Sequence, residues 1–144
     1  MSLGLYLHIP YCFSKCRYCD FYSHPGERGV PDAYVEALVR ELDRFAPERP
    51  LQPDTLYFGG GTPSLLRPEQ AKRLIDAARP LPGAEITLEA NPETVTEQSL
   101  AGFREAGVNR ISFGVQSARD TQLRTLGRPH TAKQARAAFA AARR

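Results

Sequence analysis

The chain has 144 residues, of which 42% are hydrophobic and 24% charged, and its net charge is +3. These values are typical of one globular domain with a single core, and they exclude a disordered or collagen-like chain. No apolar run approaches the roughly 18–20 residues of a membrane-spanning helix. The 19 basic residues are spread along the chain, so no nucleic-acid partner is expected. The N-terminus lacks the pattern of a secretion signal, and we expect a cytoplasmic protein.

The first half of the chain alternates between two hydrophobic periods. Residues 3–9 and 55–58 are short apolar runs of β-forming residues, which predict strands. Pro31 and Asp32 favour the start of a helix between these strands. Its apolar positions recur at three- and four-residue intervals: Tyr34, Leu38, Leu42 and Phe45. A second helix is predicted at about residues 68–78, with the apolar stripe Ala71, Leu74, Ile75 and Ala78.

The second half repeats this alternation. Strands are predicted at residues 85–88 and 110–115, and helices at about residues 95–106, 120–126 and 131–144. Thr94 and Glu97 resemble a capping box at the start of the third helix, and Thr131 and Gln134 resemble another before the last one. Gly107 and Gly127 stand where two of these helices are expected to end.

Four strands that alternate with helices in units of about thirty residues predict an α/β fold with a parallel sheet. Four such units form an arc of a barrel and not a closed one, so we expect a fragment of something longer. In such folds ligands lie at the carboxyl ends of the strands. The unusual segments follow the four strands: the cysteines at 12–19, GGGTPS at 59–64, EANP at 89–92 and QS at 116–117.

The three cysteines of the chain have the spacing CX3CX2C: Cys12, Cys16 and Cys19. An odd number of cysteines this close together argues against a disulfide framework, and thiolates are soft ligands for zinc or an iron–sulfur cluster. A structural zinc site takes four protein ligands, and the sequence offers a fourth nearby: His8, Asp20 or His24. A [4Fe–4S] cluster on three cysteines has one iron open to another ligand. The spacing alone leaves both alternatives open.

This cysteine spacing after a first strand, with an aromatic residue before the third cysteine, resembles the radical S-adenosylmethionine (SAM) family. LYLHIPYC, GGGTPS and GVQS are similar to the branch of oxygen-independent coproporphyrinogen oxidases and HemW-like heme chaperones. The resemblance implies a radical SAM (βα) barrel, of which residues 1–144 are the N-terminal part without the remaining strands and the C-terminal domain. It also implies a [4Fe–4S] cluster on Cys12, Cys16 and Cys19 whose open iron binds SAM. One electron, from a reductant such as flavodoxin or ferredoxin, then cleaves SAM to methionine and a 5′-deoxyadenosyl radical.

The same resemblance implies the SAM contacts. Gly60, Gly61 and Thr62 are expected at its methionyl portion, while Glu89 is expected to accept hydrogen bonds from SAM. Around a second SAM the resemblance places five residues: Gln116, Arg128, Tyr18, Gly61 and Thr62. Arg128 could equally be an ordinary surface arginine. Tyr6 is expected beside SAM, although a tyrosine on a first strand is more often a core residue.

Phe21 stands where the oxidases carry a further cysteine, and the chain begins almost at its first strand. Both features favour the heme-chaperone branch, which implies binding of heme and its delivery to heme-requiring proteins, notably respiratory enzymes. The alternatives are oxidative decarboxylation of coproporphyrinogen III and a non-catalytic zinc-binding module. His8 is expected to be packed with a satisfied ring, and His24 and His130 to lie in loops. No histidine is assigned to heme.

Overall fold

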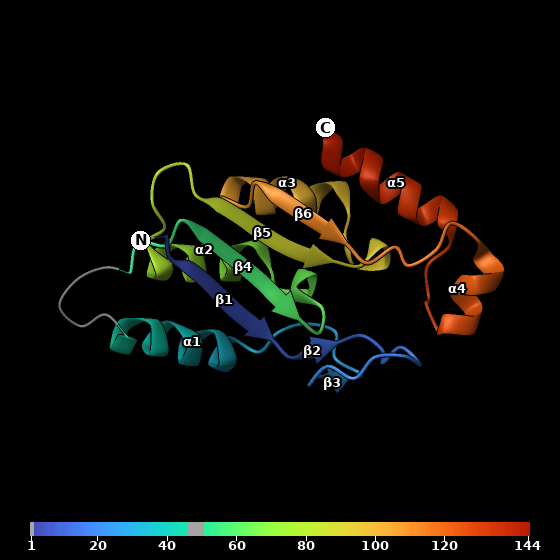
Figure 1. Cartoon of the computed structure of the whole chain (residues 1–144), viewed down its shortest axis with the longest axis horizontal. Helices are drawn as coiled ribbons and strands as arrows, with labels where there is room; N and C mark the ends of the chain where they lie inside the picture. The colour runs from blue at the N-terminus through green and yellow to red at the C-terminus, as the bar shows by residue number, and fades with distance from the viewer. Residues whose placement is uncertain (1, 46–50) are drawn as a thin grey trace.

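The computed structural model describes residues 2–45 and 51–144 of the chain. A four-stranded parallel sheet lies at its centre, in the order β1–β4–β5–β6 (Figure 1). These strands are β1 (Gly4–Ile9), β4 (Thr55–Gly60), β5 (Glu85–Ala90) and β6 (Arg110–Phe113). The four predicted strands are confirmed, with ends that differ by no more than two residues. Their spatial order follows the chain order, as it does in an arc of a (βα) barrel.

Three helices cover one face of the sheet: α1 (Asp32–Phe45), α2 (Pro68–Ala78) and α3 (Glu97–Ala106). Two short 3₁₀ turns, η1 (Pro63–Leu65) and η2 (Pro92–Thr94), follow β4 and β5. The fourth unit carries an inserted helix, α4 (Asp120–Leu126), beyond the carboxyl ends of the strands, before α5 (Ala132–Arg143) packs against α3 and η2 (Figure 1). None of the described helices is long and apolar enough to cross a bilayer.

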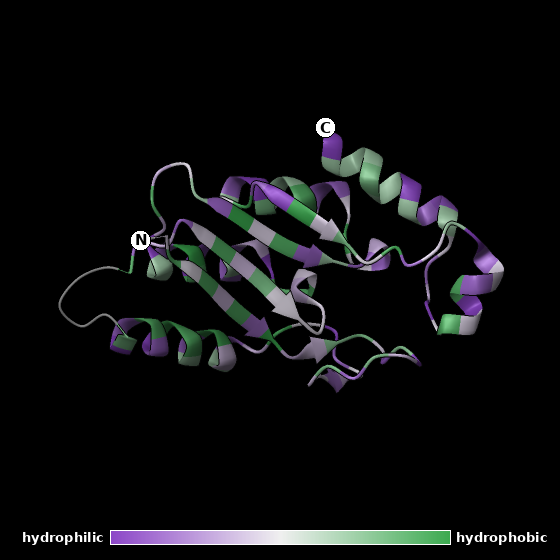
Figure 2. Ribbon diagram, viewed as in Figure 1, coloured by the Kyte–Doolittle hydropathy of each residue, from purple (hydrophilic) through white to green (hydrophobic). Residues whose placement is uncertain are grey.

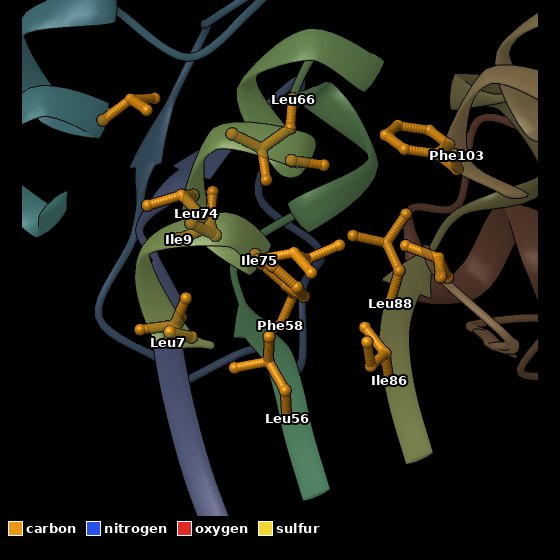
Figure 3. Close-up of a cluster of buried hydrophobic side chains, with 14 of the residues drawn as sticks. Leu7, Ile9, Leu56, Phe58, Leu66, Leu74, Ile75, Ile86, Leu88 and Phe103 are labelled. Atoms are coloured by element: carbon orange, nitrogen blue, oxygen red, sulfur yellow. The ribbon is translucent and has the colours of Figure 1, made fainter. Parts of the chain in front are cut away.

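The core lies between the sheet and its helices (Figure 3). Alternate strand residues such as Ile9, Phe58 and Leu88 are fully buried there, because successive side chains of a strand point to opposite faces. Each such side chain contributes about 1.5–3 kcal/mol through its burial. The predicted stripe of α2 is buried throughout. Phe45 was expected on the apolar face of α1, and this expectation is wrong. Phe45 is the last residue of the helix, and it is 76% exposed.

The opposite face of the sheet is polar and carries the alternate residues of each strand: Tyr6, His8, Tyr57, Glu89 and Ser112. Figure 2 shows the resulting alternation of hydrophobic and hydrophilic residues along the strands. In a (βα) barrel this face lines the interior, and the catalytic groups gather at its carboxyl-terminal rim.

The start of α3 differs from the prediction. Thr96 is the N-cap: its Oγ1 accepts a hydrogen bond from the Ser99 N–H at 3.1 Å, and Ser99 Oγ accepts one from the Thr96 N–H at 2.9 Å. Thr94 lies in η2 instead, where its hydroxyl donates to the Asn91 carbonyl at 2.9 Å. The predicted Thr94–Glu97 box is therefore wrong, because a 3₁₀ turn takes up Thr94 before the helix begins.

The other helix ends agree with the sequence. The N–H of Gln134 donates to Thr131 Oγ1 at 3.2 Å and the N–H of Thr131 to Gln134 Oε1 at 2.8 Å, which confirms the second capping box. Gly107 and Gly127 end α3 and α4 with φ of 114° and 75°, values that favour glycine.

Candidate functional site

The cysteines lie on the connection between β1 and α1. Two short strands that the sequence did not predict, β2 (Tyr11–Cys12) and β3 (His24–Pro25), pair at the base of this connection. The His24 N–H donates to the Pro10 carbonyl at 2.6 Å, and the Glu27 N–H donates to the Cys12 carbonyl at 3.0 Å. These bonds close residues 12–24 into a loop that carries three free thiols, which we call the cysteine loop. His24, expected in a loop, lies in β3.

The glycine segment after β4 runs directly beside the cysteine loop. The Gly61 N–H donates to the Ile9 carbonyl and the Thr62 N–H to the Tyr11 carbonyl, both at 2.8 Å. A Cβ on Gly61 would lie 2.7 Å from the Tyr11 oxygen and 2.9 Å from Cys12 Sγ. Only glycine allows this approach, so the GGGTPS segment is fitted to the cysteine loop and is more than a plain turn.

Glu89 is the last but one residue of β5 and lies on the polar face, where two donors hold its carboxylate. The Tyr57 hydroxyl donates to Oε1 at 2.7 Å and the Gly60 N–H to Oε2 at 3.3 Å. Burial raises the pKa of Tyr57, and its hydrogen bond to Glu89 raises it further. The carboxylate is therefore fixed beside the glycine segment and is not a solvated surface group.

Tyr6 lies on the same polar face and is 54% exposed, so it is not a core residue. Its ring stacks on Tyr57 with 6.1 Å between the centroids, and its hydroxyl bonds to His8 Nδ1 at 3.1 Å. His8 Nε2 contacts the Tyr22 carbonyl at 3.0 Å, so both of its ring nitrogens have partners, as expected. Burial, and secondarily the charge of Glu89, raise the pKa of Tyr6.

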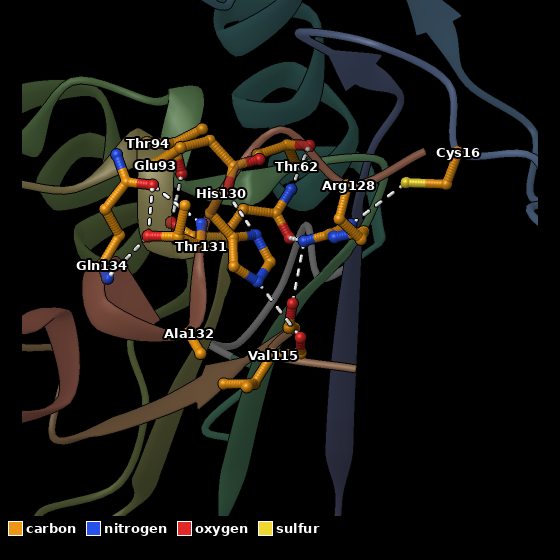
Figure 4. Close-up of polar contacts among 12 residues, drawn as sticks. Cys16, Thr62, Glu93, Thr94, Val115, Arg128, His130, Thr131, Ala132 and Gln134 are labelled. Atoms are coloured by element: carbon orange, nitrogen blue, oxygen red, sulfur yellow. Dashed lines mark hydrogen bonds and ion pairs between the residues drawn. The ribbon is translucent and has the colours of Figure 1, made fainter. Parts of the chain in front are cut away.

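Arg128 joins three of the loops and is only 8% exposed (Figure 4). Its Nη1 donates to Cys16 Sγ at 3.1 Å, and its Nη2 donates to Asn91 Oδ1 at 2.6 Å and to the Gly114 carbonyl at 2.8 Å. Its Nε is buried without a hydrogen-bond partner in the part of the chain that the structure describes. Arg128 is thus no ordinary surface arginine, and one of its donors is available to a ligand.

A cavity of about 290 Å³ opens between these loops. Every predicted site residue except Tyr6 lines it: Cys12, Cys16, Cys19, Tyr18, Gly60, Gly61, Thr62, Glu89, Gln116 and Arg128. Burial raises the pKa of Tyr18, and the Arg128 charge opposes this shift. Gln116 has a φ of 65°, a strained conformation for a residue other than glycine. The structure therefore gathers these residues from four separate loops into one site.

The positions of the thiols can be compared with the needs of a zinc ion and of a [4Fe–4S] cluster. Among residues 2–45 and 51–144, no group of three His, Cys, Asp or Glu side chains converges on a position for one metal ion. The three candidates for a fourth zinc ligand, His8, Asp20 and His24, do not line the cavity with the thiols. A [4Fe–4S] cluster takes each cysteine on a different iron, and all three thiols line the same cavity. The glycine cradle and the unpartnered Arg128 Nε fit a polar ligand beside such a cluster.

Sequence reasoning missed two residues, one that lines this site and one that lies behind it. Asn91 bridges Arg128 to the glycine segment, since its Nδ2 donates to Thr62 Oγ1 at 3.3 Å. His130, expected in a loop, does lie between α4 and α5 but is only 2% exposed (Figure 4). Its Nδ1 lies 3.0 Å from Glu93 Oε2, and its Nε2 lies 3.1 Å from the Val115 carbonyl. The only signal for Asn91 was its position after a strand, and none existed for His130.

Comparison with known proteins supplies the family. A family model of the radical SAM superfamily matches residues 6–144. The chain belongs to this superfamily. Among the relatives that it matches, the heme chaperone HemW of Escherichia coli (strain K12) is 46% identical over 144 residues, a match that covers 94% of this chain and 38% of HemW. The mitochondrial radical S-adenosyl methionine domain-containing protein 1 of Bos taurus is 43% identical, and the match covers 98% of this chain and 33% of that protein.

A solved radical SAM structure confirms the expected fold. The coproporphyrinogen III oxidase HemN from Escherichia coli superposes with a TM-score of 0.87 at 31% identity, over 99% of this chain and 34% of HemN. The radical SAM fold and the resemblance to HemW are therefore confirmed. The chain spans 38% of the length of the E. coli HemW that it matches.

Proposed function

We propose that residues 1–144 are the N-terminal part of a radical SAM core domain, which holds a [4Fe–4S] cluster on Cys12, Cys16 and Cys19. One observation carries this proposal: the three thiols line a single cavity together with the glycine segment that follows β4. Three cysteine ligands leave one iron open to SAM. When bound, the cluster supplies the electron that cleaves SAM.

The residues of the chain provide the binding and orientation around that chemistry. Backbone groups of Gly60 and Gly61 meet the methionyl portion of SAM, where no side chain hinders approach. The Glu89 carboxylate accepts hydrogen bonds from the amine or ribose hydroxyls of SAM. Arg128 Nε is a donor for an oxygen of the ligand. The Tyr18 hydroxyl, which belongs to a residue lining the same cavity, is a further hydrogen-bond donor for the ligand.

Tyr6, Thr62 and Gln116 complete the proposed SAM contacts. Thr62 and Gln116 line the cavity, whereas Tyr6 lies farther back on the polar face of β1 and stacks on Tyr57, which holds Glu89. We therefore assign Thr62 and Gln116 to the ligand itself and Tyr6 to the approach along the barrel interior.

For the whole protein we propose the function of a heme chaperone, which binds heme and delivers it to heme-requiring proteins such as respiratory enzymes. Support comes from the 46% identity to HemW. Phe21 adds further support, because it stands at the position where the oxidase branch carries a further cysteine. Its side chain is 68% exposed and lines the cavity. The reductant, the heme acceptors and the cytoplasmic location stay predictions.

A second function, the oxidative decarboxylation of coproporphyrinogen III, is supported by the structural match to HemN. The two functions share the cluster and SAM and differ in the tetrapyrrole. A decarboxylase releases carbon dioxide from coproporphyrinogen III, whereas a chaperone binds heme and transfers it without changing it.

The test begins with electron paramagnetic resonance of the full-length protein, anaerobically reconstituted and reduced with dithionite. We expect a [4Fe–4S]⁺ signal that changes when SAM is added and is lost in Cys16→Ala. Stoichiometric zinc in a colourless protein, with no cluster formed, would overturn the cofactor assignment. The loaded protein is then incubated with heme and an apo-heme protein, or with coproporphyrinogen III. Heme transfer without carbon dioxide release supports the chaperone, and the opposite result supports the oxidase.

A further inference from the structure

The connection from α4 to α5 reaches the cysteine loop at two points. The Arg17 N–H donates to the Leu126 carbonyl at 3.2 Å, and Arg128 Nη1 donates to Cys16 Sγ at 3.1 Å. Between these contacts, a Cβ on Gly127 would lie 3.3 Å from Arg17 Cγ. Residues 126–130 therefore lie directly against the cysteine loop, and their position decides how Arg128 meets Cys16.

His130 attaches this segment to the strand ends. Its side chain is fully buried, and that of Glu93 is only 16% exposed. The Val115 carbonyl can only accept a hydrogen bond, so His130 Nε2 carries a proton and donates it at 3.1 Å. His130 Nδ1 lies 3.0 Å from Glu93 Oε2, within hydrogen-bond distance. The result is a buried hydrogen bond from the α4–α5 connection to η2, where removal of either partner leaves the other unsatisfied.

His130 does not line the cavity and contacts none of the cysteines, so it does not act on a ligand directly. It is also not needed to begin α5. The Thr131–Gln134 capping box does that, and the Ala132 N–H donates to Asp120 Oδ1 at 2.8 Å. Two backbone bonds at the end of α4 hold the start of residues 126–130, from the Gly127 N–H to the Arg124 carbonyl at 3.1 Å and from the Arg128 N–H to the Leu123 carbonyl at 2.9 Å. The His130 contacts hold the other end of this segment.

We propose that His130, through Glu93 and Val115, is a positioning residue that aims the Arg128 guanidinium at Cys16 Sγ. This inference rests on the proposed function, in which Cys16 is a cluster ligand. A hydrogen bond donated to a cluster thiolate stabilises the reduced, more negatively charged cluster and raises its reduction potential. His130 thereby sets the potential at which the cluster accepts its electron, although it lies outside the cavity.

The test uses the full-length protein with its reconstituted cluster and three variants. His130→Phe keeps a buried ring and removes both nitrogens, while Glu93→Gln keeps a partner for His130 Nδ1, since the glutamine amide N–H donates to it. Thr125→Ala is the control, since Thr125 is exposed on α4 and its hydroxyl bonds only within that helix. We expect His130→Phe to shift the midpoint potential to more negative values and to weaken SAM binding about tenfold. Glu93→Gln and Thr125→Ala should keep wild-type values.

Hydrogen exchange at the Arg17 amide gives a readout that needs no cluster. We expect faster exchange in His130→Phe than in the wild type, because the Leu126 carbonyl is no longer held in place. If His130→Phe does not fold, Glu93→Ala replaces it, since the same shift is expected when the ring remains. A folded variant with unchanged potential and unchanged Arg17 exchange would overturn the proposal. A wild-type protein that assembles no cluster contradicts the proposed function instead, and Arg17 exchange then still decides the positioning role.

Discussion

The hydroxyl of Tyr57 donates a 2.7 Å hydrogen bond to Oε1 of Glu89, from the middle of β4 to the end of β5. Both side chains stand on the polar face of the sheet, where parallel neighbours bring them together. The other carboxylate oxygen accepts from the Gly60 N–H at 3.3 Å. Glu89 is thus oriented by its own sheet before any ligand arrives, which lowers the cost of binding one.

This bond predicts a dependence of stability on pH. The pKa of Tyr57 is raised, first by burial and then by its bond to Glu89. A group with a higher pKa in the folded protein contributes stability that is complete below its unfolded pKa of about 10 and is lost as pH rises through the folded value. We expect the free energy of unfolding to fall from about pH 10 upward, and to fall less in Tyr57→Phe. Urea unfolding between pH 8 and 11 measures this, and parallel curves would contradict it.

The close approach at Gly61 predicts a strong effect of a single methyl group. In Gly61→Ala the new Cβ would lie 2.7 Å from the Tyr11 oxygen and 2.9 Å from Cys12 Sγ, so one of the two loops must move. We expect a loss of about 1–3 kcal/mol in the free energy of unfolding, together with poorer cluster assembly. Gly29→Ala is the matched control, because its Cβ would meet its nearest neighbour at an ordinary 4.0 Å. Chemical denaturation and iron content per chain measure both effects.

The bridging position of Asn91 predicts that its substitution weakens SAM binding, although Asn91 bonds to none of the cysteines. Asn91→Ala removes the bridge from Arg128 to Thr62, and we expect SAM binding to weaken about tenfold. Asn109→Ala is the control at the other end of β5, where the side chain binds only the backbone of Ala84 and Ile86. The control should lose about 1–3 kcal/mol of stability and keep its SAM affinity. Equal dissociation constants for both variants, by equilibrium dialysis, would refute the bridging role.

The cap at the start of α3 predicts that substitutions of Thr96 and Glu97 lower the free energy of unfolding by different amounts. Thr96→Ala removes the observed N-cap and should cost about 1 kcal/mol in the free energy of unfolding. Glu97→Gln should cost less than about 0.5 kcal/mol, because Glu97 acts only on the helix dipole and in an exposed pair with Arg144. Urea denaturation of both variants measures the difference. A larger loss of stability in Glu97→Gln than in Thr96→Ala would instead support the Thr94–Glu97 capping box that the sequence suggested.

The sequence by itself determined the four strands, the main helices and the family. Apolar spacing is local, so the buried stripe of α2 and the alternation along β1 could be identified without any contact being known. The cysteine spacing and the GGGTPS segment were equally local, and they led to the correct family. Where a local pattern had two solutions, as at Thr94 and Thr96, sequence analysis chose wrongly, because both threonines fit an N-cap and only the turn at Pro92 separates them.

Only the tertiary structure decided which distant residues contact one another around the cavity. Arg128 meets Cys16 across 112 positions, and His130 meets Glu93 across 37. Neither pair leaves a periodic signal, because a buried arginine and a buried histidine look in sequence like any other polar loop residue. Their roles follow from the parallel sheet, which brings the ends of β1, β4, β5 and β6 to one edge, and from α4, which turns the chain back toward the cysteine loop. Burial then makes each polar contact specific, since an unsatisfied donor away from water costs about 1–3 kcal/mol.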